Sequence, residues 1–422
     1  MIDQQEPLSP AKIGLYSVGD LGASIVYSFA NTAFPLFLTS YPAVPNWAVG
    51  LLAQERSLVG AFIQPLVGAI SDRLPPNRLG KRRPFFLLGV PLAAVALLFF
   101  ASHPPMVAVL AVMTIFSFFL NIAYDPYLAL MIDIAPEKQR GRIGGVMAVF
   151  RMCGQAVTIT IAFLLWTNHE PLVFLLVALG LVVAFSVTFV SVQEPAIVPQ
   201  VKPEGLQLKP AEYLRDLWSQ REVMKYLGAT FFYWFGVGGV IPFITRFGVQ
   251  ALDLKENVSF TLLLPALVGT ALAAVPAGII GERVGKKPVL AAGLAIFGVA
   301  TVLSALLARS YVEALIALFL LGLCNGVANA LLFPLFTELI PGQRAGELTG
   351  ISSTVWSLAQ PIGAFGAGLL ADGTGTVRGA FAAAGVALLI GFGLLMTVRV
   401  PRTARVVHTA PDPEIAMASS RP

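Results

Sequence analysis

Charged residues are scarce in this chain. Asp, Glu, Lys and Arg together make up only 12% of its 422 residues, whereas they make up about 25% of a typical soluble domain. Hydrophobic residues account for 56% of the chain. This composition excludes an ordinary soluble domain and indicates a protein that crosses a membrane many times.

Cysteine and histidine are also rare, and the motifs of common enzymes are missing. The chain has two cysteines, Cys153 and Cys324, and three histidines. Both cysteines lie inside apolar runs and outside any metal-binding or redox pattern, so we interpret them as small packing residues. No nucleotide-binding loop, zinc motif or acyl-transfer elbow is present. We therefore expect neither an enzyme nor an ATP-driven pump, and no metal or cofactor.

The long apolar runs predict membrane-spanning helices. A spanning helix needs roughly 20 apolar residues, whereas outer-membrane strands need alternating segments of about ten. The predicted fold is therefore an all-α membrane protein with twelve spans. The first six cover about 12–40, 46–71, 84–102, 105–133, 141–167 and 171–191, and the second six about 223–250, 258–280, 288–308, 311–338, 345–371 and 377–398.

One polar break divides these spans into two sets of six. It predicts an N-terminal six-helix bundle at 1–191, a cytoplasmic linker at 192–222, a C-terminal six-helix bundle at 223–400 and a disordered tail at 401–422. Apolar residues at helical spacing within the linker, at 206–218, predict a short helix lying in the membrane interface.

Two motifs occur once in each set of spans. The turn at 68–85 combines an acid, an Arg, a Gly and several basic residues, and a shorter version returns at 278–288. A stretch at 126–140 with an acid, a Pro and a final Arg returns at 334–344. Two repeats in the same order predict two pseudo-symmetric halves, which is typical of secondary transporters.

Basic residues are confined to alternate loops. Lys and Arg gather at 73–83, 138–142 and 283–287, whereas the loops at 41–46 and 102–105 have none. Short loops rich in Lys and Arg stay on the cytoplasmic side, so both termini are predicted to be cytoplasmic, in a plasma or inner membrane. This asymmetry accounts for the net charge of +5, and we expect the lipid bilayer rather than nucleic acid as the basic residues' partner.

The turn at 68–85 resembles the turn between helices 2 and 3 of the major facilitator superfamily. The matching residues are Gly68, Asp72, Arg73, Gly80, Lys81 and Arg82. The spacing of this turn is similar to that of the proton-coupled sucrose transporters, and the start of the chain at 12–22 is similar to that of the glycoside, pentoside and hexuronide cation symporters. The resemblance implies a monomer with two six-helix bundles that transports a small molecule by alternating access.

The resemblance also implies a conformational latch on the cytoplasmic side. In the superfamily, the turn holds the two halves together and releases them during the inward transition. The predicted latch residues are Gly68, Asp72, Arg73, Gly80, Lys81, Arg82, Asp133, Arg140, Glu282, Arg283, Glu338 and Arg344. The alternative is that these residues only set the topology.

Two departures from the resembling families concern the coupling ion and the substrate. The cation symporters have paired acids on helix 2 where this chain has Gly60 and Gln64, so we expect a proton, rather than sodium, as the coupling ion. The sucrose transporters have an Arg on helix 4 after the Gly-Pro turn, and none follows Pro126 here. Either another Arg takes its role or the substrate differs.

Charges inside the spans are candidates for proton coupling. Ionisable side chains in the membrane are costly and usually functional. Asp20, Asp125 and Arg151 lie on three spans at a similar depth, counting 1.5 Å per residue. We predict that Asp20 or Asp125 takes up a proton while Arg151 adjusts its pKa, because burial and a nearby guanidinium act on a carboxyl pKa in opposite directions. The alternative is a permanent ion pair.

Polar and aromatic residues in the spans are candidates for substrate binding. Amides and aromatic rings suit a sugar, which offers hydroxyl groups and apolar faces. The predicted substrate-binding residues are Glu55, Arg56, Tyr233, Trp234, Asn325, Asn329, Trp356 and Gln360. Ordinary packing is the alternative for each aromatic residue.

These observations together predict a proton-coupled symporter for a sugar or glycoside, such as a sucrose-like disaccharide. Two alternatives stay open: a proton-coupled exporter of an amphipathic or lipid-like compound, and a membrane assembly factor that does not transport.

Overall fold

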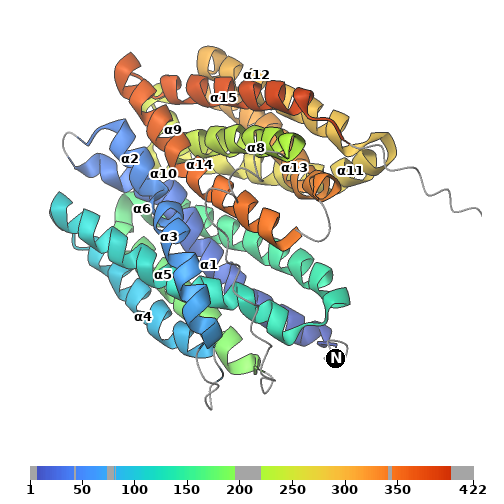
Figure 1. Ribbon diagram of the computed structural model, residues 1–422. Coiled ribbons are helices and arrows are strands. Elements are labelled where there is room, and N and C mark those ends of the chain that lie inside the picture. The colour runs from blue at the N-terminus through green and yellow to red at the C-terminus, as the bar shows by residue number, and fades with distance from the viewer. Residues whose placement is uncertain are drawn as a thin grey trace, which may run out of the picture.

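The computed structural model describes residues 7–41, 44–73, 80, 82–194, 220–340 and 345–400, and this part of the chain is helical with no strand (Figure 1). The predicted linker helix at 206–218, the predicted disordered tail at 401–422, and the latch residues Lys81 and Arg344 lie outside these residues. We call 7–194 the first half and 220–400 the second half.

The first half contains six spans, as the sequence predicts. Two of these spans depart from a simple helix: Gln54 breaks the second span into α2 and α3, and His169, with φ −143° and ψ 47°, divides α6 into the fifth and sixth spans just before Pro171. The helices are α1 (Pro10–Phe37), extended by the 3-10 turn Leu38–Ser40, α2 (Asn46–Ala53), α3 (Glu55–Arg73), α4 (Arg83–Phe100), α5 (Met106–Ile134) and α6 (Glu137–Ser191).

The second half also contains six spans, two of which are built from shorter segments. The seventh span joins α8 (Arg221–Val240), the 3-10 turn Ile241–Phe243 and α9 (Ile244–Leu252), and the eighth joins α10 (Glu256–Ser259), the 3-10 turn Phe260–Leu262 and α11 (Leu263–Val284). The remaining helices are α12 (Lys286–Leu307), α13 (Tyr311–Leu339), α14 (Ala345–Thr374) and α15 (Arg378–Thr397). The prediction of an all-helical fold with twelve spans is therefore confirmed.

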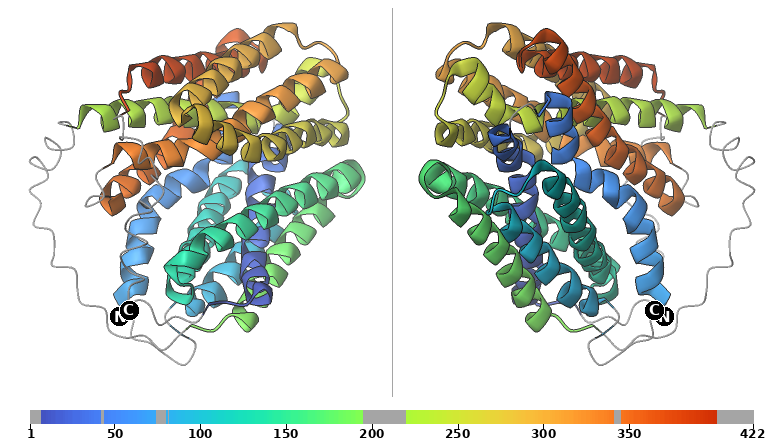
Figure 2. Two further views of the ribbon diagram at one scale, coloured as in Figure 1. Left: turned by 90° about the vertical axis from the view of Figure 1, so that its right-hand side faces the viewer. Right: turned by 90° about the vertical axis from the view of Figure 1, so that its left-hand side faces the viewer.

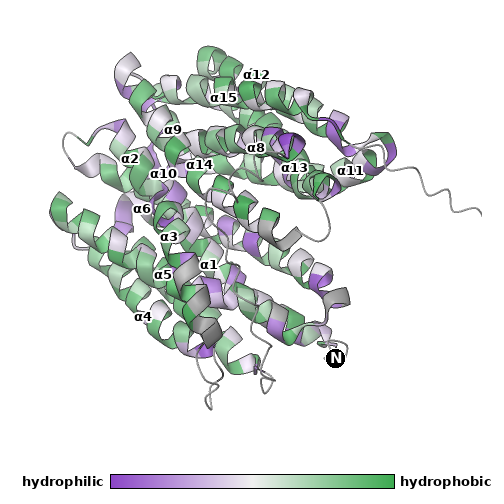
Figure 3. Ribbon diagram, in the orientation of Figure 1, coloured by the Kyte–Doolittle hydropathy of each residue, from purple (hydrophilic) through white to green (hydrophobic). Residues whose placement is uncertain are grey.

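Apolar side chains cover the outside of the bundle, as expected for a protein in lipid. Val107 is 80% exposed and Val275 is 70% exposed, and hydrophobic residues dominate most helices in Figure 3. In contrast, 83% of the residues in the most apolar stretch of α1 are buried inside the protein, against 44% in that of α4. Of these two helices, the first, which carries Asp20, is thus the more enclosed.

Each half is held together by its own helix pairs. In the first half α1 packs on α6, and α5 packs on both α3 and α4. In the second half α11 packs on α13, α12 on α15, and α8 on α14 and α15 (Figure 2). The predicted pseudo-symmetry is visible in this arrangement, because α3 with α5 and α11 with α13 are the second and fourth spans of their halves.

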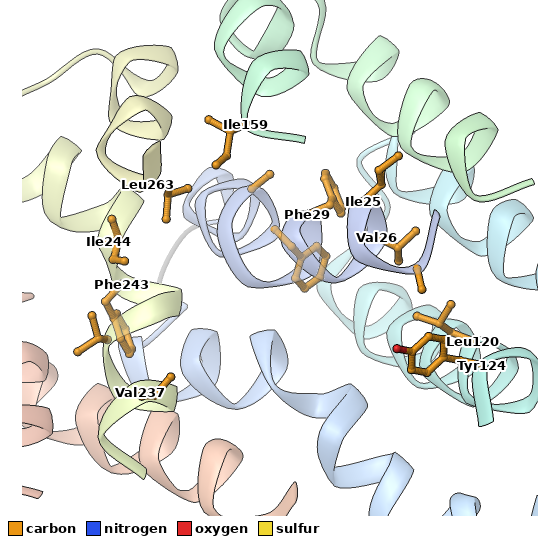
Figure 4. Close-up of a cluster of buried hydrophobic side chains, with 14 of the residues drawn as sticks. Ile25, Val26, Phe29, Leu120, Tyr124, Ile159, Val237, Phe243, Ile244 and Leu263 are labelled. Carbon is orange, nitrogen blue, oxygen red and sulfur yellow. The ribbon is translucent and has the colours of Figure 1, made fainter. Parts of the chain in front are cut away.

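The two halves meet through a smaller set of segments. α14 packs against α2 and α3, α9 packs against α1, and α10 packs against α6. Apolar side chains fill this contact, where Phe243 and Ile244 lie on the side of α1 away from Leu120 (Figure 4). We call the end of the molecule with the start of α4 and the start of α12 the basic end, and the end with the start of α2 the opposite end. α2, α9 and α10 gather at the opposite end, and the ribbons of the halves diverge toward the basic end (Figure 1).

Candidate functional site

A buried carboxylate on α1 lies at the centre of the first half. Asp20 is 1% exposed. Arg151 of α6 donates from Nη2 and Nε to Asp20 Oδ2, at 3.0 and 3.2 Å, and the hydroxyl of Tyr124 on α5 donates to Oδ1 at 2.8 Å. The Arg151 side chain is 49% exposed. The arrangement is thus an enclosed acid whose cationic partner reaches a more open region.

Aromatic contacts extend this cluster to the helix break between α2 and α3. The rings of Tyr124 and Tyr27 lie edge to face with centroids 5.1 Å apart. The guanidinium of Arg56 lies 3.8 Å from the centroid of the Tyr27 ring, a distance suited to a cation–π interaction. Gln54, at the break, donates to Asn31 of α1 at 2.7 Å. Residues on α1, α3, α5 and α6 therefore form one connected polar cluster, which we call the first-half cluster: Asp20, Tyr27, Arg56, Tyr124 and Arg151.

Asp125 lies apart from the ion pair. The sequence predicts that the charges of Asp20, Asp125 and Arg151 share one level, and the structure brings only Asp20 and Arg151 into contact. One carboxylate oxygen of Asp125 is buried without a hydrogen-bond partner among the described residues, and Arg56 is the cation that acts on Asp125 electrostatically. Whether Asp20 or Asp125 carries the proton stays a prediction, and the geometry now separates their surroundings.

Glu55 points into the first half. Its carboxylate accepts a hydrogen bond from the hydroxyl of Ser117 on α5, and its residue is 8% exposed. Asn121, one turn further along α5, donates to the carbonyls of Ser117 and Arg56. Glu55 and Arg56 thus have separate partners on separate faces, as their adjacency predicts. The predicted contact of either residue with substrate stays a prediction.

The second half brings together most of its predicted substrate-binding residues. The hydroxyl of Tyr233 on α8 donates to Asn325 Oδ1 on α13 at 2.8 Å, and Asn325 Nδ2 donates to Thr270 on α11 at 3.2 Å. The rings of Trp234 and Trp356 lie 5.9 Å apart. These contacts connect α8, α11, α13 and α14 around amide and aromatic groups.

Two further residues of that prediction lie at the edges of this group. Asn329, one turn beyond Asn325, is exposed. Gln360 is half-buried, and its backbone packs so closely on Gly238 that a Cβ there would lie 2.4 Å from the Gln360 carbonyl oxygen. The close approach explains the glycine, and it shows that Gln360 helps join α14 to α8.

Three of the predicted latch residues, Arg82, Asp133 and Glu338, take part in ion pairs within their own half. Arg82 pairs with Asp133, joining the start of α4 to the end of α5. Lys286 pairs with Glu338 at 2.7 Å, joining the start of α12 to the end of α13. These are the third and fourth spans of the two halves, so the pairs are structural equivalents. Their predicted role in connecting the halves stays a prediction.

Other latch residues surround these pairs. Gly80 has φ +92°, a backbone conformation that glycine adopts readily. Arg140 donates to the carbonyl of Ala135 at 3.2 Å. Glu282 and Arg283 are exposed at the end of α11. Gly68, Asp72 and Arg73 belong to the last turns of α3.

Sequence reasoning missed several polar residues that the fold brings to these positions. Tyr27, Gln54, Tyr124, Ser117 and Thr270 all take part in the contacts around the predicted residues. Their only signal in the sequence is a polar group within an apolar run. Because the rotation of each helix decides which polar groups meet, the sequence pattern did not identify these partners.

A cavity of about 1080 Å³ lies at the basic end of the second half. Two of its basic side chains are already engaged: Lys225 contacts Glu222 and the Thr397 carbonyl, and Lys287 donates to the carbonyls of Met396 and Val398. These bonds tie the end of α15 to α8 and α12. The cavity is separate from the predicted substrate-binding residues, and we assign it a structural role. Within the described ranges, no cluster of metal-ligating side chains occurs.

The arrangement defines a transporter-like membrane protein: two six-span halves, with a buried acid–arginine pair in the first and a group of amide and aromatic side chains in the second. The family model for MFS/sugar transport proteins matches residues 15–398, so the chain belongs to this family of the major facilitator superfamily.

Solved transporters share the fold. The nucleoside transporter NupG, solved as a mutant, is 12% identical, with a TM-score of 0.72 and coverage of 92% of this chain and 97% of that chain. A bacterial homologue of the human lysosomal transporter Spinster, solved inward-facing and occupied, is 14% identical, with a TM-score of 0.67 and coverage of 92% and 95%. No curated protein matches the sequence.

Proposed function

We propose that this protein is a proton-coupled symporter for a sugar or glycoside, with a sucrose-like disaccharide as the first candidate substrate. Membership of the MFS/sugar transport family supports a transport role. The observation that carries proton coupling is the ion pair of buried Asp20 with half-exposed Arg151. A charge pair within a membrane span is costly to maintain and marks a functional site by default.

Asp20 is the proposed proton carrier. When its carboxylate takes up a proton, the carboxyl group becomes neutral and its attraction for Arg151 weakens. Arg151 then becomes available to bind hydroxyl groups of the substrate. Tyr124, which donates to the other oxygen of Asp20, keeps the carboxyl group in place in both protonation states. Release of the proton restores the ion pair and expels the substrate from Arg151.

The second half supplies the proposed sugar contacts. Trp234 and Trp356 offer ring faces for the apolar faces of a sugar, and Asn325, Asn329 and Gln360 offer amide groups for its hydroxyls. Asn325 is already aligned by Tyr233 and Thr270. Substrate bound between these groups and Arg151 would couple recognition in one half to protonation in the other.

The test is uptake of a panel of radiolabelled disaccharides into proteoliposomes with an imposed inward proton gradient. We expect the parent protein to accumulate at least one sugar and an uncoupler to abolish accumulation. Asp20→Asn should lose gradient-driven accumulation, because it cannot carry the proton. It should keep exchange of internal for external sugar, since exchange needs no net proton movement.

Matched variants identify the carrier. Asp125→Asn keeps accumulation if Asp20 is the carrier, and loses it if Asp125 is. Arg142→Gln alters an exposed arginine on the same helix as Arg151 and should leave uptake unchanged, whereas Arg151→Gln should reduce it. Full accumulation by Asp20→Asn would refute the assignment. Failure to transport any sugar, with proton-driven efflux of a preloaded lipid-like compound instead, would replace sugar import with the export hypothesis. Replacing the proton gradient with a sodium gradient tests the coupling ion.

A further inference from the structure

The strongest feature outside the proposed transport site is a carboxylate that caps a helix of the other half. Asp372, near the end of α14, accepts hydrogen bonds at Oδ1 from the backbone N–H and side-chain amide of Asn46, at 2.9 and 2.7 Å. Its Oδ2 accepts from the backbone N–H of Trp47 at 3.0 Å. Asn46 and Trp47 are the first two residues of α2.

α2 has no such cap within its own half. Its N-cap residue is Pro45, which makes no side-chain hydrogen bond, and its first turn contains no acid. The first N–H groups of a helix lack intrahelical partners, and a negative charge at this end is favourable. Asp372 therefore supplies from the second half what the sequence around α2 does not, and it can do so only while the halves are together at this end.

The backbones around this cap are in close contact. A Cβ at Gly50 would lie 2.3 Å from the carbonyl oxygen of Ala364, and one at Gly368 would lie 2.5 Å from the carbonyl oxygen of Asn46. The rings of Trp47 and Phe365 pack edge to face, with their centroids 5.8 Å apart. α2 and α14 must therefore separate as units, and the bonds to Asp372 must break when they do.

A buried arginine in the second half lacks the hydrogen bonds that Asp372 has. Arg246 on α9 is 6% exposed, and its Nε and Nη1 have no hydrogen-bond partner within the described part of the chain. The neighbouring Thr245 donates to the Thr32 carbonyl of α1 at 2.9 Å, so this stretch of α9 lies in the contact between halves. Asp372 is the charged group that acts on Arg246 electrostatically. A buried guanidinium with unsatisfied N–H groups destabilises the state that encloses it.

We propose that Asp372 and Arg246 set the balance between the closed and open states of the opposite end. Asp372 is a positioning residue that favours closure by capping α2 across the two halves, and Arg246 opposes closure because closure buries its charge. The inference goes beyond sugar transport and needs only that the halves separate at this end. Its test does not depend on knowing the substrate.

The experiment measures the distance between spin labels on the two halves, in the full-length protein reconstituted in lipid. Cys153 and Cys324 are first replaced by Ala. Labels are then placed at the exposed residues Ser102 and Leu307, which lie where α4 and α12 finish, both at the opposite end of the molecule. Opening of this end lengthens the distance. Asp372→Ala should raise the ratio of open to closed molecules about fivefold or more, the factor that corresponds to ~1 kcal/mol for a lost N-cap.

Three further variants make the result specific. Asp372→Asn keeps one acceptor oxygen and should give a smaller shift in the same direction. Arg246→Met in the Asp372→Ala background should lower the open fraction again. Glu313→Ala is the matched control, because Glu313 caps backbone N–H groups of Arg309 and Ser310 within its own half, and it should leave the ratio unchanged.

Two results would overturn the proposal. One is an unchanged distance distribution in both Asp372 variants, measured on folded protein. The other is an equal shift in Glu313→Ala, which would show a general loss of stability instead of a change at the α2 cap. A failure of sugar uptake in the parent protein would leave the distance measurements and their interpretation intact.

Discussion

At the scale of single residues, a reciprocal tyrosine pair shows how polar groups are satisfied inside the first half. The hydroxyl of Tyr16 donates to the Tyr127 carbonyl at 2.6 Å, and the hydroxyl of Tyr127 donates to the Tyr16 carbonyl at 2.9 Å. The rings stack with centroids 4.7 Å apart, and neither residue is exposed. The pair therefore fixes α1 against α5 close to Asp20.

The two hydroxyl groups are predicted to differ in their contribution to stability. The Tyr16 carbonyl also accepts a hydrogen bond from Thr188 at 3.2 Å, so it keeps a side-chain donor in Tyr127→Phe. The Tyr127 carbonyl loses its side-chain donor in Tyr16→Phe. We expect both variants to lower the melting temperature in detergent, Tyr16→Phe by more, with a loss of about 1 kcal/mol in the range of interhelical hydrogen bonds in membranes.

The control for this comparison is Tyr41→Phe, which removes a hydroxyl bonded to the Pro104 carbonyl in a half-buried turn. It should have the smallest effect of the three. Equal melting temperatures for Tyr16→Phe and Tyr127→Phe would show that Thr188 does not compensate.

The sequence indicated the charged residues of the first-half cluster better than their partners. Asp20 and Arg151 stand out because charges inside apolar runs are rare, and their predicted contact is present. Tyr124 and Tyr27 do not stand out, because an uncharged tyrosine is tolerated in an apolar run and only the helix rotation turns these two toward Asp20 and Arg56. Arg246 is also a charge inside an apolar run, but its place in the sequence gives no indication of the contact between the halves in which its stretch of α9 lies.

At the scale of helices, the sequence predicted spans better than breaks. The division of α6 follows from His169, Glu170 and Pro171, which interrupt the apolar run and were predicted as a loop. The break at Gln54 was not predicted, because the run at 46–71 contains no proline before Pro65. The partner of Gln54, Asn31, lies on another helix, α1. Such a tertiary contact leaves no pattern in the local sequence.

Close packing of α11 on α13 depends on glycines and gives a prediction at this scale. A Cβ at Gly322 would lie 2.2 Å from the carbonyl oxygen of Ala266, and one at Gly326 would lie 2.5 Å from that of Thr270. Small residues four apart are a common basis for close helix contacts in membranes. Gly322→Ala should therefore push the helices apart and destabilise the protein by about 1–3 kcal/mol, as overpacking does.

Gly278→Ala is the matched control, because Gly278 lies on α11 and a Cβ added there would meet no atom within 4 Å. This variant should keep or raise the melting temperature, since alanine favours helix more than glycine does. The measurement is thermal unfolding in detergent. Displacement of α11 in Gly322→Ala should also weaken the hydrogen bond between Asn325 and Thr270, so binding of any transported sugar should fall as well. A melting temperature of Gly322→Ala equal to that of the parent would show that the helices adjust without cost.

At the scale of the whole molecule, the repeated motifs correctly predicted the relation between the halves. Arg82 with Asp133 and Lys286 with Glu338 join equivalent helices, although the motifs containing them differ in length. The repeats carry no information on which end of the molecule is closed. That asymmetry arises from contacts such as Asp372 with α2, which connect segments more than three hundred residues apart.

The orientation of the protein in the membrane determines which side of the membrane the closed end faces. The basic end contains Arg82, Arg83, Lys286 and Lys287, and loops rich in such residues remain cytoplasmic. The closed opposite end should then face outward, so the described state would admit substrate from the cytoplasm.

To test this orientation, Cys153 and Cys324 are first replaced. Single cysteines are then introduced at exposed positions: Ser102 or Lys255 for the opposite end, and Arg142 or Glu282 for the basic end. A membrane-impermeant maleimide added to intact cells should label the first two and label the last two only after lysis. The reverse pattern would make the described state outward-facing, and the cap at Asp372 would then close the cytoplasmic side.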